Sequence, residues 1–285
     1  YGLVGLKTHS KITLVVRREE DGIKRYVHLG TGNYNDQTAK LYTDMGLLTC
    51  SDPIGEDATA VFNMLSGYSE PRKWNKLAVA PIWLKDKFLM LINREAENAR
   101  QGKKARIIAK MNSLCDPKVM EALYDASAAG VKIDLIVRGI CCIKAGVPGL
   151  SENISVRSIV GNFLEHSRIF YFYNDGFEDI YMGSADWMPR NLDKRVEITF
   201  PVEDPDLKKR IKDILKIQLA DTLKAHIMQP DGSYEKQDLR GKVKLDSQMY
   251  FAEEARKRSA KPEDADAAIS HDRVFIPIEA EESEH

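Results

Sequence analysis

The sequence predicts an α/β protein with mixed, mostly parallel sheets flanked by helices. Two observations support this class. From about residue 77, short β-branched runs alternate with amphipathic helical segments, as in strands connected by helices. In addition, one order of parts occurs twice: a histidine, a strand, a tight turn, a returning strand and a Gly-Ser/Thr motif. The 285 residues, 43% of them apolar, allow two globular domains.

The first part of the chain, residues 1 to 76, begins with a predicted hairpin. Alternating Ile12, Leu14 and Val16 indicate one strand, and residues 26 to 29 indicate a second across a polar turn. A helix is predicted over residues 57 to 65, with Gly67 as its C-terminal cap. The polar, proline-bearing residues 69 to 76 are expected to form a linker.

The second part, residues 77 to 258, is expected to hold the larger sheet. In chain order we predict a helix over 84 to 102, a strand over 105 to 111, a helix over 116 to 129, a strand over 131 to 137 and a long helix over 204 to 225. Arg138 follows a strand at its carboxyl end, where open α/β sheets usually bind ligands. Residues 259 to 285 turn acidic and are expected to be a disordered tail.

Composition restricts where the protein works. The longest apolar stretches are far too short to cross a bilayer, and no basic-then-apolar leader opens the chain. We therefore expect a cytoplasmic protein without a transmembrane segment and leave association with a membrane surface open. The four cysteines include no C-x-x-C pair and are expected to be reduced thiols.

The charge is unevenly distributed along the chain. Residues 263 to 285 carry eight acids and one arginine, so the formal net charge of −1 leaves +6 on residues 1 to 262. A basic body suits a polyanionic partner, although solvated surfaces often carry an excess of this size. The chain begins with Tyr1 and its first motif follows eight residues later, so we expect a C-terminal fragment whose first domain is truncated at its N-terminus.

The repeat carries the candidate chemistry. In the first copy His9-Ser10-Lys11 precedes the hairpin and Gly30-Thr31-Gly32-Asn33 follows it. His166-Ser167-Arg168 and Gly183-Ser184-Ala185-Asp186 hold the same places in the second copy. An acid follows each copy at the same distance, since Asn33 to Asp44 and Asp186 to Glu197 are both 11 residues. Two homologous halves predict a pseudo-twofold arrangement in which both imidazoles face one cleft.

These residue types suit phosphoryl transfer. A neutral imidazole is a good nucleophile toward phosphorus. Lys11 and Arg168 stand two residues after their histidines, so on a strand each points to the same face and can offset charge on the transferred oxygens. Asn33, Thr31 and Ser184 can add hydrogen bonds. A lone histidine at a strand edge is usually structural, and it is the duplicated context that favours a functional His9.

The pattern H-x-K/R followed by G-[ST]-x-[ND] resembles the phospholipase D superfamily, which implies two phospholipase D-like domains. The superfamily usually carries an aspartate five residues after the lysine, where this chain has Val16 and Tyr173. A phosphodiesterase or nuclease is therefore a disfavoured alternative. A module that binds polyanions without catalysis is a second alternative.

A more specific resemblance is carried by seven motifs in order. They are GLKTHSK at 5 to 11, HLGTGNYN at 28 to 35, AKLYTD at 39 to 44, LIVRGICC at 135 to 142, GLSENI at 149 to 154, LEHSR at 164 to 168 and SADWM at 184 to 188. With these motifs, residues 1 to 257 are similar to the polyphosphate kinase family that uses phosphohistidine. Asn162 departs from the basic residue that the family commonly has there.

The resemblance implies a function and a set of site residues. It implies reversible transfer of the ATP γ-phosphate to inorganic polyphosphate through phosphorylated His9. Tyr42, Arg138 and His166 match the nucleotide-contacting positions, and His166 can also serve as acid or base. Lys11, Asn33 and Arg168 are expected as supporting phosphate contacts. Mg²⁺ is the expected cofactor, held by residues upstream of Tyr1.

The expected partners follow from the same resemblance. They are ATP, ADP and polyphosphate, without nucleic acid, and the full-length protein is expected to be a homo-oligomer. The fragment alone is expected to bind polyphosphate and to turn over little.

Overall fold

The computed structural model describes residues 2–67, 69 and 71–259. Residues Tyr1–Ser247 form one compact unit, and a second unit begins at Gln248. Of the second unit the structure describes most of helix α7 (Ser247–Ser259), whose last turn is basic. Apart from Ser259, the acidic tail that we expected to be disordered lies outside the described residues.

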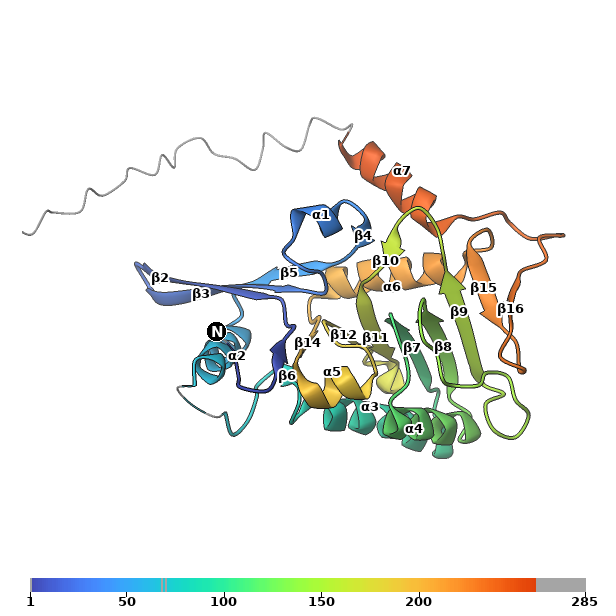
Figure 1. The fold of residues 1–285 in the computed structure, drawn as a ribbon, viewed down its shortest axis with the longest axis horizontal. Coiled ribbons are helices and arrows are strands. Elements are labelled where there is room, and N and C mark those ends of the chain that lie inside the picture. Colours follow the sequence, from blue (N-terminus) through green and yellow to red (C-terminus); the bar gives the residue numbers. More distant parts are fainter. Residues whose placement is uncertain (1, 68, 70, 260–285) are drawn as a thin grey trace, which may run out of the picture. The chain divides into compact units, whose positions relative to one another are not determined.

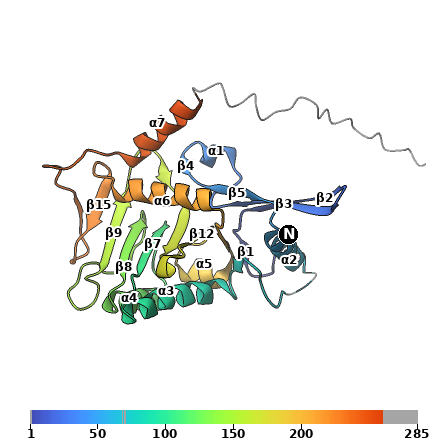
Figure 2. The same ribbon diagram turned by 180° about the vertical axis from the view of Figure 1, so that it is seen from behind.

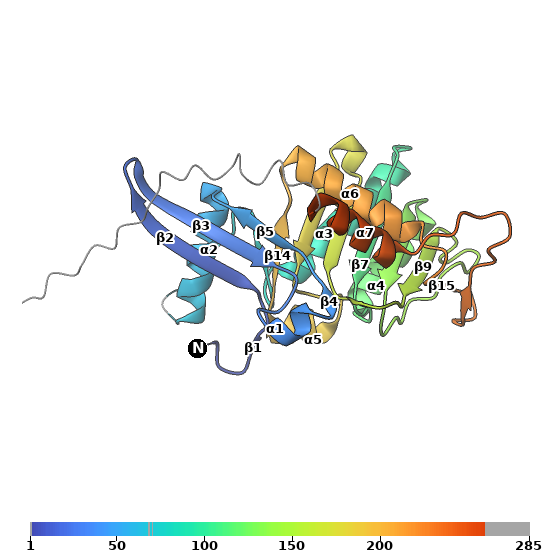
Figure 3. The same ribbon diagram turned by 90° about the horizontal axis from the view of Figure 1, so that it is seen from above.

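The predicted hairpin is present in the first part of the chain. The elements are β1 (Lys7–Thr8), β2 (Ile12–Glu19), β3 (Gly22–Gly30), α1 (Asp36–Ala39), β4 (Tyr42–Thr43), β5 (Gly46–Thr49) and α2 (Asp52–Leu65). Strand β2 pairs antiparallel with β3, and β5 adds to the other edge of β3. Figure 3 shows these three strands side by side. Helix α2 begins five residues before the predicted start because Pro53 opens its first turn.

The second part contributes the remaining elements of the compact unit. They are β6 (Ala78–Val79), α3 (Leu84–Arg100), β7 (Arg106–Met111), α4 (Pro117–Ala128), β8 (Lys132–Val137), β9 (Ile154–Ile159), β10 (Leu164–Glu165), β11 (Arg168–Phe172), η1 (Asn174–Gly176), β12 (Asp179–Gly183), α5 (Pro189–Lys194), β13 (Arg195–Val196), β14 (Ile198–Pro201), α6 (Pro205–Leu219), β15 (Ala225–Met228) and β16 (Tyr234–Lys236). Helices α3 and α4 and strands β7 and β8 confirm the predicted segments to within two residues.

The large sheet is mixed, as predicted, but its parallel portion is smaller than we expected. Its order is β16-β15-β9-β8-β7-β11-β12-β14-β6, and only the β7–β8 and β8–β9 pairs are parallel. The other pairs are antiparallel. The reason is local, because β11 and β12 are joined by a turn over residues 173–178, and a connection this short can only reverse the chain.

Helices cover both faces of this sheet, as the α/β class requires. Figures 1 and 2 show α3 and α4 on one side and α6 on the other. Neighbouring residues of β7 supply the two faces: Ile107 joins the cluster formed with α3 and α4, and Ile108 joins the cluster formed with α6. The second cluster also takes in Leu29 of β3 and Ile54 of α2, so one core crosses from the first part of the chain to the second.

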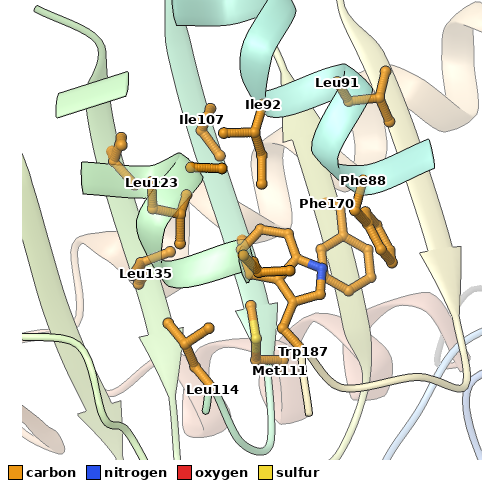
Figure 4. Packing of buried hydrophobic residues seen from close by; sticks show 14 of the residues in the cluster. Phe88, Leu91, Ile92, Ile107, Met111, Leu114, Leu123, Leu135, Phe170 and Trp187 are labelled. Carbon is orange, nitrogen blue, oxygen red and sulfur yellow. The ribbon is translucent and has the colours of Figure 1, made fainter. Parts of the chain in front are cut away.

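An aromatic group anchors the second Gly-Ser motif. Trp187 is fully buried and stacks on Phe170, with ring centroids 5.2 Å apart, and Phe88 of α3 lies 4.6 Å from Phe170. Figure 4 shows these rings packed among aliphatic side chains of β7, α3 and α4. Because Trp187 follows Asp186 directly, its packing holds the end of the motif against the sheet.

The predicted last helix was too long. Helix α6 ends at Leu219 rather than at residue 225. Buried Asp221 accepts hydrogen bonds from the backbone N–H groups of Lys224, Ala225 and Ser247 at 2.7–3.2 Å. This carboxylate organises a turn, after which β15 pairs with β9.

Candidate active site

Each of the two histidines is positioned by the part of the chain to which it does not belong. Strand β1 leads into His9 and pairs parallel with β13, and the N–H groups of His9 and Ser10 both donate to the carbonyl oxygen of Val196, at 2.9 and 3.0 Å. Strand β10 leads into His166 and pairs parallel with β4. The N–H groups of His166 and Ser167 donate to the carbonyl oxygen of Thr43, at 3.2 and 3.0 Å.

Each imidazole also receives a carboxylate from the part of the chain to which it does not belong. Nδ1 of His9 lies 2.9 Å from Glu197, which is fully buried, and Nδ1 of His166 lies 2.8 Å from Asp44. We call these two contacts the crossed histidine–carboxylate pairs. A carboxylate accepts the Nδ1 proton, so Nε2 of a neutral imidazole keeps its lone pair. The side chain of His9 is 19% exposed and that of His166 is 8% exposed, so His9 is the more accessible of the two.

The hydroxyl groups of the two glycine motifs bind these acids. Thr31 Oγ1 donates to Asp44 at 2.7 Å, and the Ser184 hydroxyl donates to Glu197. Asn191 adds an N–H bond of 2.6 Å to Glu197. Thr31 and Ser184 were expected to offer hydrogen bonds to a phosphate. Instead they orient the carboxylates, because each motif ends next to the acid of its own part.

The two basic residues of the repeat have equivalent places. Lys11 Nζ donates to the carbonyl oxygen of His9 at 2.5 Å, and Arg168 donates to that of His166 at 2.8 Å. Burial lowers the pKa of Lys11 to about 8, while the nearby carboxylates of Glu197 and Asp44 oppose the shift. Arg168 also donates to the carbonyl oxygen of Thr31 at 3.3 Å, so the basic residue of the second copy reaches the glycine motif of the first, and the two copies share one polar cluster.

Tyr42 and Arg138 lie near His166. The ring of Tyr42 lies 4.9 Å from the His166 imidazole, centroid to centroid. Burial lowers the pKa of His166, and the positive charge of Arg168 acts in the same direction, against Asp44. Burial also lowers the pKa of Arg138. The positive charge of Arg168 acts in the same direction, whereas Asp186 and Tyr42 oppose the shift. Asn112 accepts a hydrogen bond from Arg138 at 2.5 Å and donates one to the carbonyl oxygen of His166 at 3.4 Å, so Arg138 lies near His166 and Tyr42.

Asn33 is the third residue that we expected to contact phosphate. It is exposed, and its side chain makes no hydrogen bond within the described part of the chain. Its counterpart in the repeat, Asp186, is buried and binds Arg168 at 3.2 Å. The partner of Asp186 on the other side is Asn112, which follows β7.

Within the described residues no group of three or more histidine, cysteine, aspartate or glutamate side chains is arranged to hold a metal ion. The acids of the site are already engaged by imidazole, hydroxyl, amide or guanidinium groups. The described residues do not fit a resident Mg²⁺ site. The same residues contain no helix with the length and apolar character of a membrane span.

Three functional candidates were not assigned a role from the sequence. The equal spacing of Asp44 and Glu197 was a usable signal, but it did not reveal that each acid serves the other histidine. Asn112 stands in no repeated motif, and only the fold brings it to Arg138 and Asp186.

The fold and the site define a class of protein: a duplicated α/β scaffold with two crossed histidine–carboxylate pairs among basic side chains. The chain belongs to the polyphosphate kinase family. Residues 1–71 match the family described as polyphosphate kinase C-terminal domain 1, and residues 77–248 match polyphosphate kinase C-terminal domain 2. The division that we expected between residues 76 and 77, and the other domain limits, stay predictions.

Relatives support the same membership. The chain is 58% identical over 234 residues to a polyphosphate kinase of Synechocystis, covering 82% of this chain and 32% of that protein. It is 50% identical to one of Lactiplantibacillus plantarum, covering all of this chain and 40% of that protein. The crystal structure of the Porphyromonas gingivalis polyphosphate kinase matches with a TM-score of 0.84 at 38% identity, covering 90% of this chain and 40% of that one. The chain thus spans less than half the length of these relatives.

Proposed function

We propose that this chain carries the phosphoryl-transfer centre of a polyphosphate kinase, in which His9 passes the γ-phosphoryl group of ATP to inorganic polyphosphate. The observation that carries the proposal is the His9–Glu197 contact of 2.9 Å through Nδ1. It leaves Nε2, which has no hydrogen bond within the described residues, as the nucleophilic atom. Family membership supplies the substrate class.

In the first step the lone pair of His9 Nε2 forms a bond to the γ-phosphorus of ATP. The bond between that phosphorus and its bridging oxygen breaks, and ADP leaves with the electron pair. The imidazole then carries positive charge, which buried Glu197 stabilises through Nδ1–H. Lys11 lies beside the same histidine and offsets charge on the phosphoryl oxygens.

In the second step a terminal oxygen of polyphosphate attacks the phosphorus of phosphohistidine. The N–P bond breaks, its electrons return to Nε2, and the polymer is longer by one unit. Because the N–P bond conserves transfer potential, the sequence of steps also runs backward from polyphosphate and ADP. His166 is buried and has a lowered pKa, which favours the neutral imidazole and a role in orienting the nucleotide or accepting a proton.

The neighbouring positions of Tyr42, Arg138 and His166 support their assignment to the nucleotide. Arg138 offers terminal amino groups that have no partner within the described residues. We keep Mg²⁺ as a proposed companion of the ATP phosphates. Since the described residues form no site for it, no step above depends on a protein-bound ion.

The test is transfer of label from γ-labelled ATP, using a form of the protein extended to the length of its relatives. The wild type should acquire acid-labile label, His9→Ala should acquire none, and His28→Ala should label normally. His28 is a matched control because it contacts Tyr34, at 2.7 Å, rather than either carboxylate of the site. Full labelling of folded His9→Ala would refute the assignment.

Two outcomes would favour the alternatives. Cleavage of phosphodiesters without ATP would indicate a phospholipase D-type enzyme. Salt-sensitive polyphosphate binding without any labelled histidine would indicate a binding module.

A further inference from the structure

Asn112 lies where strand β7 reaches the site, next to two of its cations. It directly follows Met111, the last residue of β7, and is 6% exposed. Its side chain is an amide, which has one accepting oxygen and one donating nitrogen. These two ends face different partners, so the orientation of the amide is fixed by its surroundings.

The accepting groups of Asn112 hold Arg138 and the residue after it. The side-chain oxygen Oδ1 accepts a hydrogen bond from Arg138 Nε at 2.5 Å, and the backbone oxygen accepts one from the N–H of Gly139 at 2.8 Å. A Cβ atom on Gly139 would lie 2.8 Å from that backbone oxygen, so the close approach requires glycine. Asn112 thus holds the side chain of Arg138 directly and the backbone of the next residue, Gly139, as well.

The donating groups of Asn112 point the other way. Its backbone N–H donates to Asp186 Oδ1 at 2.7 Å, and its amide nitrogen lies 3.2 Å from the same oxygen. Asp186 in turn accepts from Arg168 Nε at 3.2 Å, and Arg168 bonds to the carbonyl oxygen of His166. Asn112 therefore links Arg138 to the group of residues that surrounds His166.

The side chain of Asn112 carries no charge, and this decides what Arg138 can bind. A carboxylate at position 112 would also orient the guanidinium, but it would cancel the positive charge and would repel Asp186. An amide oxygen directs Arg138 through Nε and leaves its charge and its two terminal amino groups available. Guanidinium groups in that state bind phosphate oxygens in pairs.

We propose that Asn112 is a positioning residue that holds the guanidinium of Arg138 toward the phosphates of the bound nucleotide. The inference rests on the proposed nucleotide role of Arg138. In this proposal Asn112 makes no contact of its own with the nucleotide, and its effect on nucleotide binding passes through Arg138.

A double-mutant cycle on ATP tests this relation in the extended form of the protein. Asn112→Ala should raise the KM for ATP about tenfold, the usual effect of losing one hydrogen bond to a charged group. Arg138→Ala should raise it by at least as much, and the double variant should be no worse than Arg138→Ala. Transfer from already phosphorylated enzyme to polyphosphate needs no ATP, and its rate should stay within about twofold in Asn112→Ala.

Two further variants separate positioning from a loss of structure. Asn153→Ala is the matched control, because Asn153 donates to the carbonyl oxygen of Ser127 at 2.9 Å, and this bond ties α4 to the residue before β9. It should leave the KM for ATP unchanged. Asn112→Ser keeps a hydroxyl near Asp186 but is too short to reach Arg138, so it should reproduce the change in KM even if Asn112→Ala folds poorly.

The outcomes distinguish the nucleotide role of Arg138 from the positioning role of Asn112. A normal KM for ATP in Arg138→Ala would refute the proposed nucleotide role of Arg138. A raised KM in Arg138→Ala, together with a normal KM in both Asn112 variants, would refute the positioning role alone. Losses that add in the double variant would also refute it, because independent effects mean that Asn112 does not act through Arg138.

Discussion

Replacing Glu197 by glutamine should slow the phosphorylation of His9 without unfolding the protein. Glu197 is fully buried, and the groups around it are donors: His9 Nδ1, the Ser184 hydroxyl and the Asn191 amide. A glutamine offers one accepting oxygen and one donating nitrogen, so at least one donor would face another donor. The imidazole would lose the anion that stabilises its charged form.

The size of the effect follows from the bond that is lost. A hydrogen bond to a charged group is worth about 1.5–3 kcal/mol, and about 1.4 kcal/mol corresponds to a factor of ten in rate. The rate of label transfer from ATP to His9 should therefore fall by roughly 10- to 100-fold. The KM for ATP should change little, because Glu197 lies on the side of His9 rather than beside Tyr42 and Arg138.

Rapid-quench measurement of labelled protein at saturating ATP checks this prediction. Glu203→Gln is the matched control, since Glu203 is half exposed and pairs with Lys76 on the surface. Circular dichroism and thermal melts confirm that both variants are folded. If folded Glu197→Gln acquires label as fast as wild type, the carboxylate does not govern the nucleophile, and the reasoning is wrong.

Three other perturbations address the remaining parts of the site and the core. Lys11, with its pKa lowered to about 8, should lose its charge as the pH rises past that value, so transfer should decline there in the wild type and persist in Lys11→Arg. The folded state holds this proton less tightly than the unfolded state, so the unfolding free energy should rise between pH 8 and 10.5. Denaturant titrations at several pH values measure this rise, and Lys11→Met should lack it. Gly32→Ala would place a Cβ atom 2.4 Å from the Asp44 carboxylate, so ATP binding, measured calorimetrically, should weaken about tenfold as the second crossed pair shifts. Phe170→Ala should lower the unfolding free energy by about 3–5 kcal/mol in urea titrations, because the ring packs against Trp187; a loss below about 1 kcal/mol would contradict the described core.

Much of the site could be anticipated from the repeat, because it is written in local order along the chain. The two histidines, their basic neighbours and the glycine motifs recur in the same order, and the structure gives the histidines and their basic neighbours equivalent contacts. The acids Asp44 and Glu197 recur too, but spacing within one copy says nothing about contacts with the other copy. Those contacts depend on pairs of two-residue strands that lie far apart in the chain, such as β1 with β13.

The parts that were missed have physical causes of the same kind. The share of parallel pairing was overestimated because the strand–helix alternation of residues 84–137 was taken to represent the whole sheet, although the second copy of the repeat adds the antiparallel hairpin β11–β12. Helix α6 was extended too far because its last residues continue an amphipathic pattern, whereas the buried carboxylate of Asp221 ends it through tertiary hydrogen bonds. Asn112 occupies an unrepeated position, so its role depends entirely on the fold.

The crossed histidine–carboxylate pairs make the two parts of the chain chemically interdependent. A chain severed within residues 72–76 would yield two pieces, each with one histidine of the crossed pairs and with the acid that binds the histidine of the other piece. Neither ring would keep a defined tautomer until the pieces reassociated. A substitution of the acid in one piece therefore impairs the histidine of the other piece, and both histidines regain their carboxylate partners only when the two pieces associate.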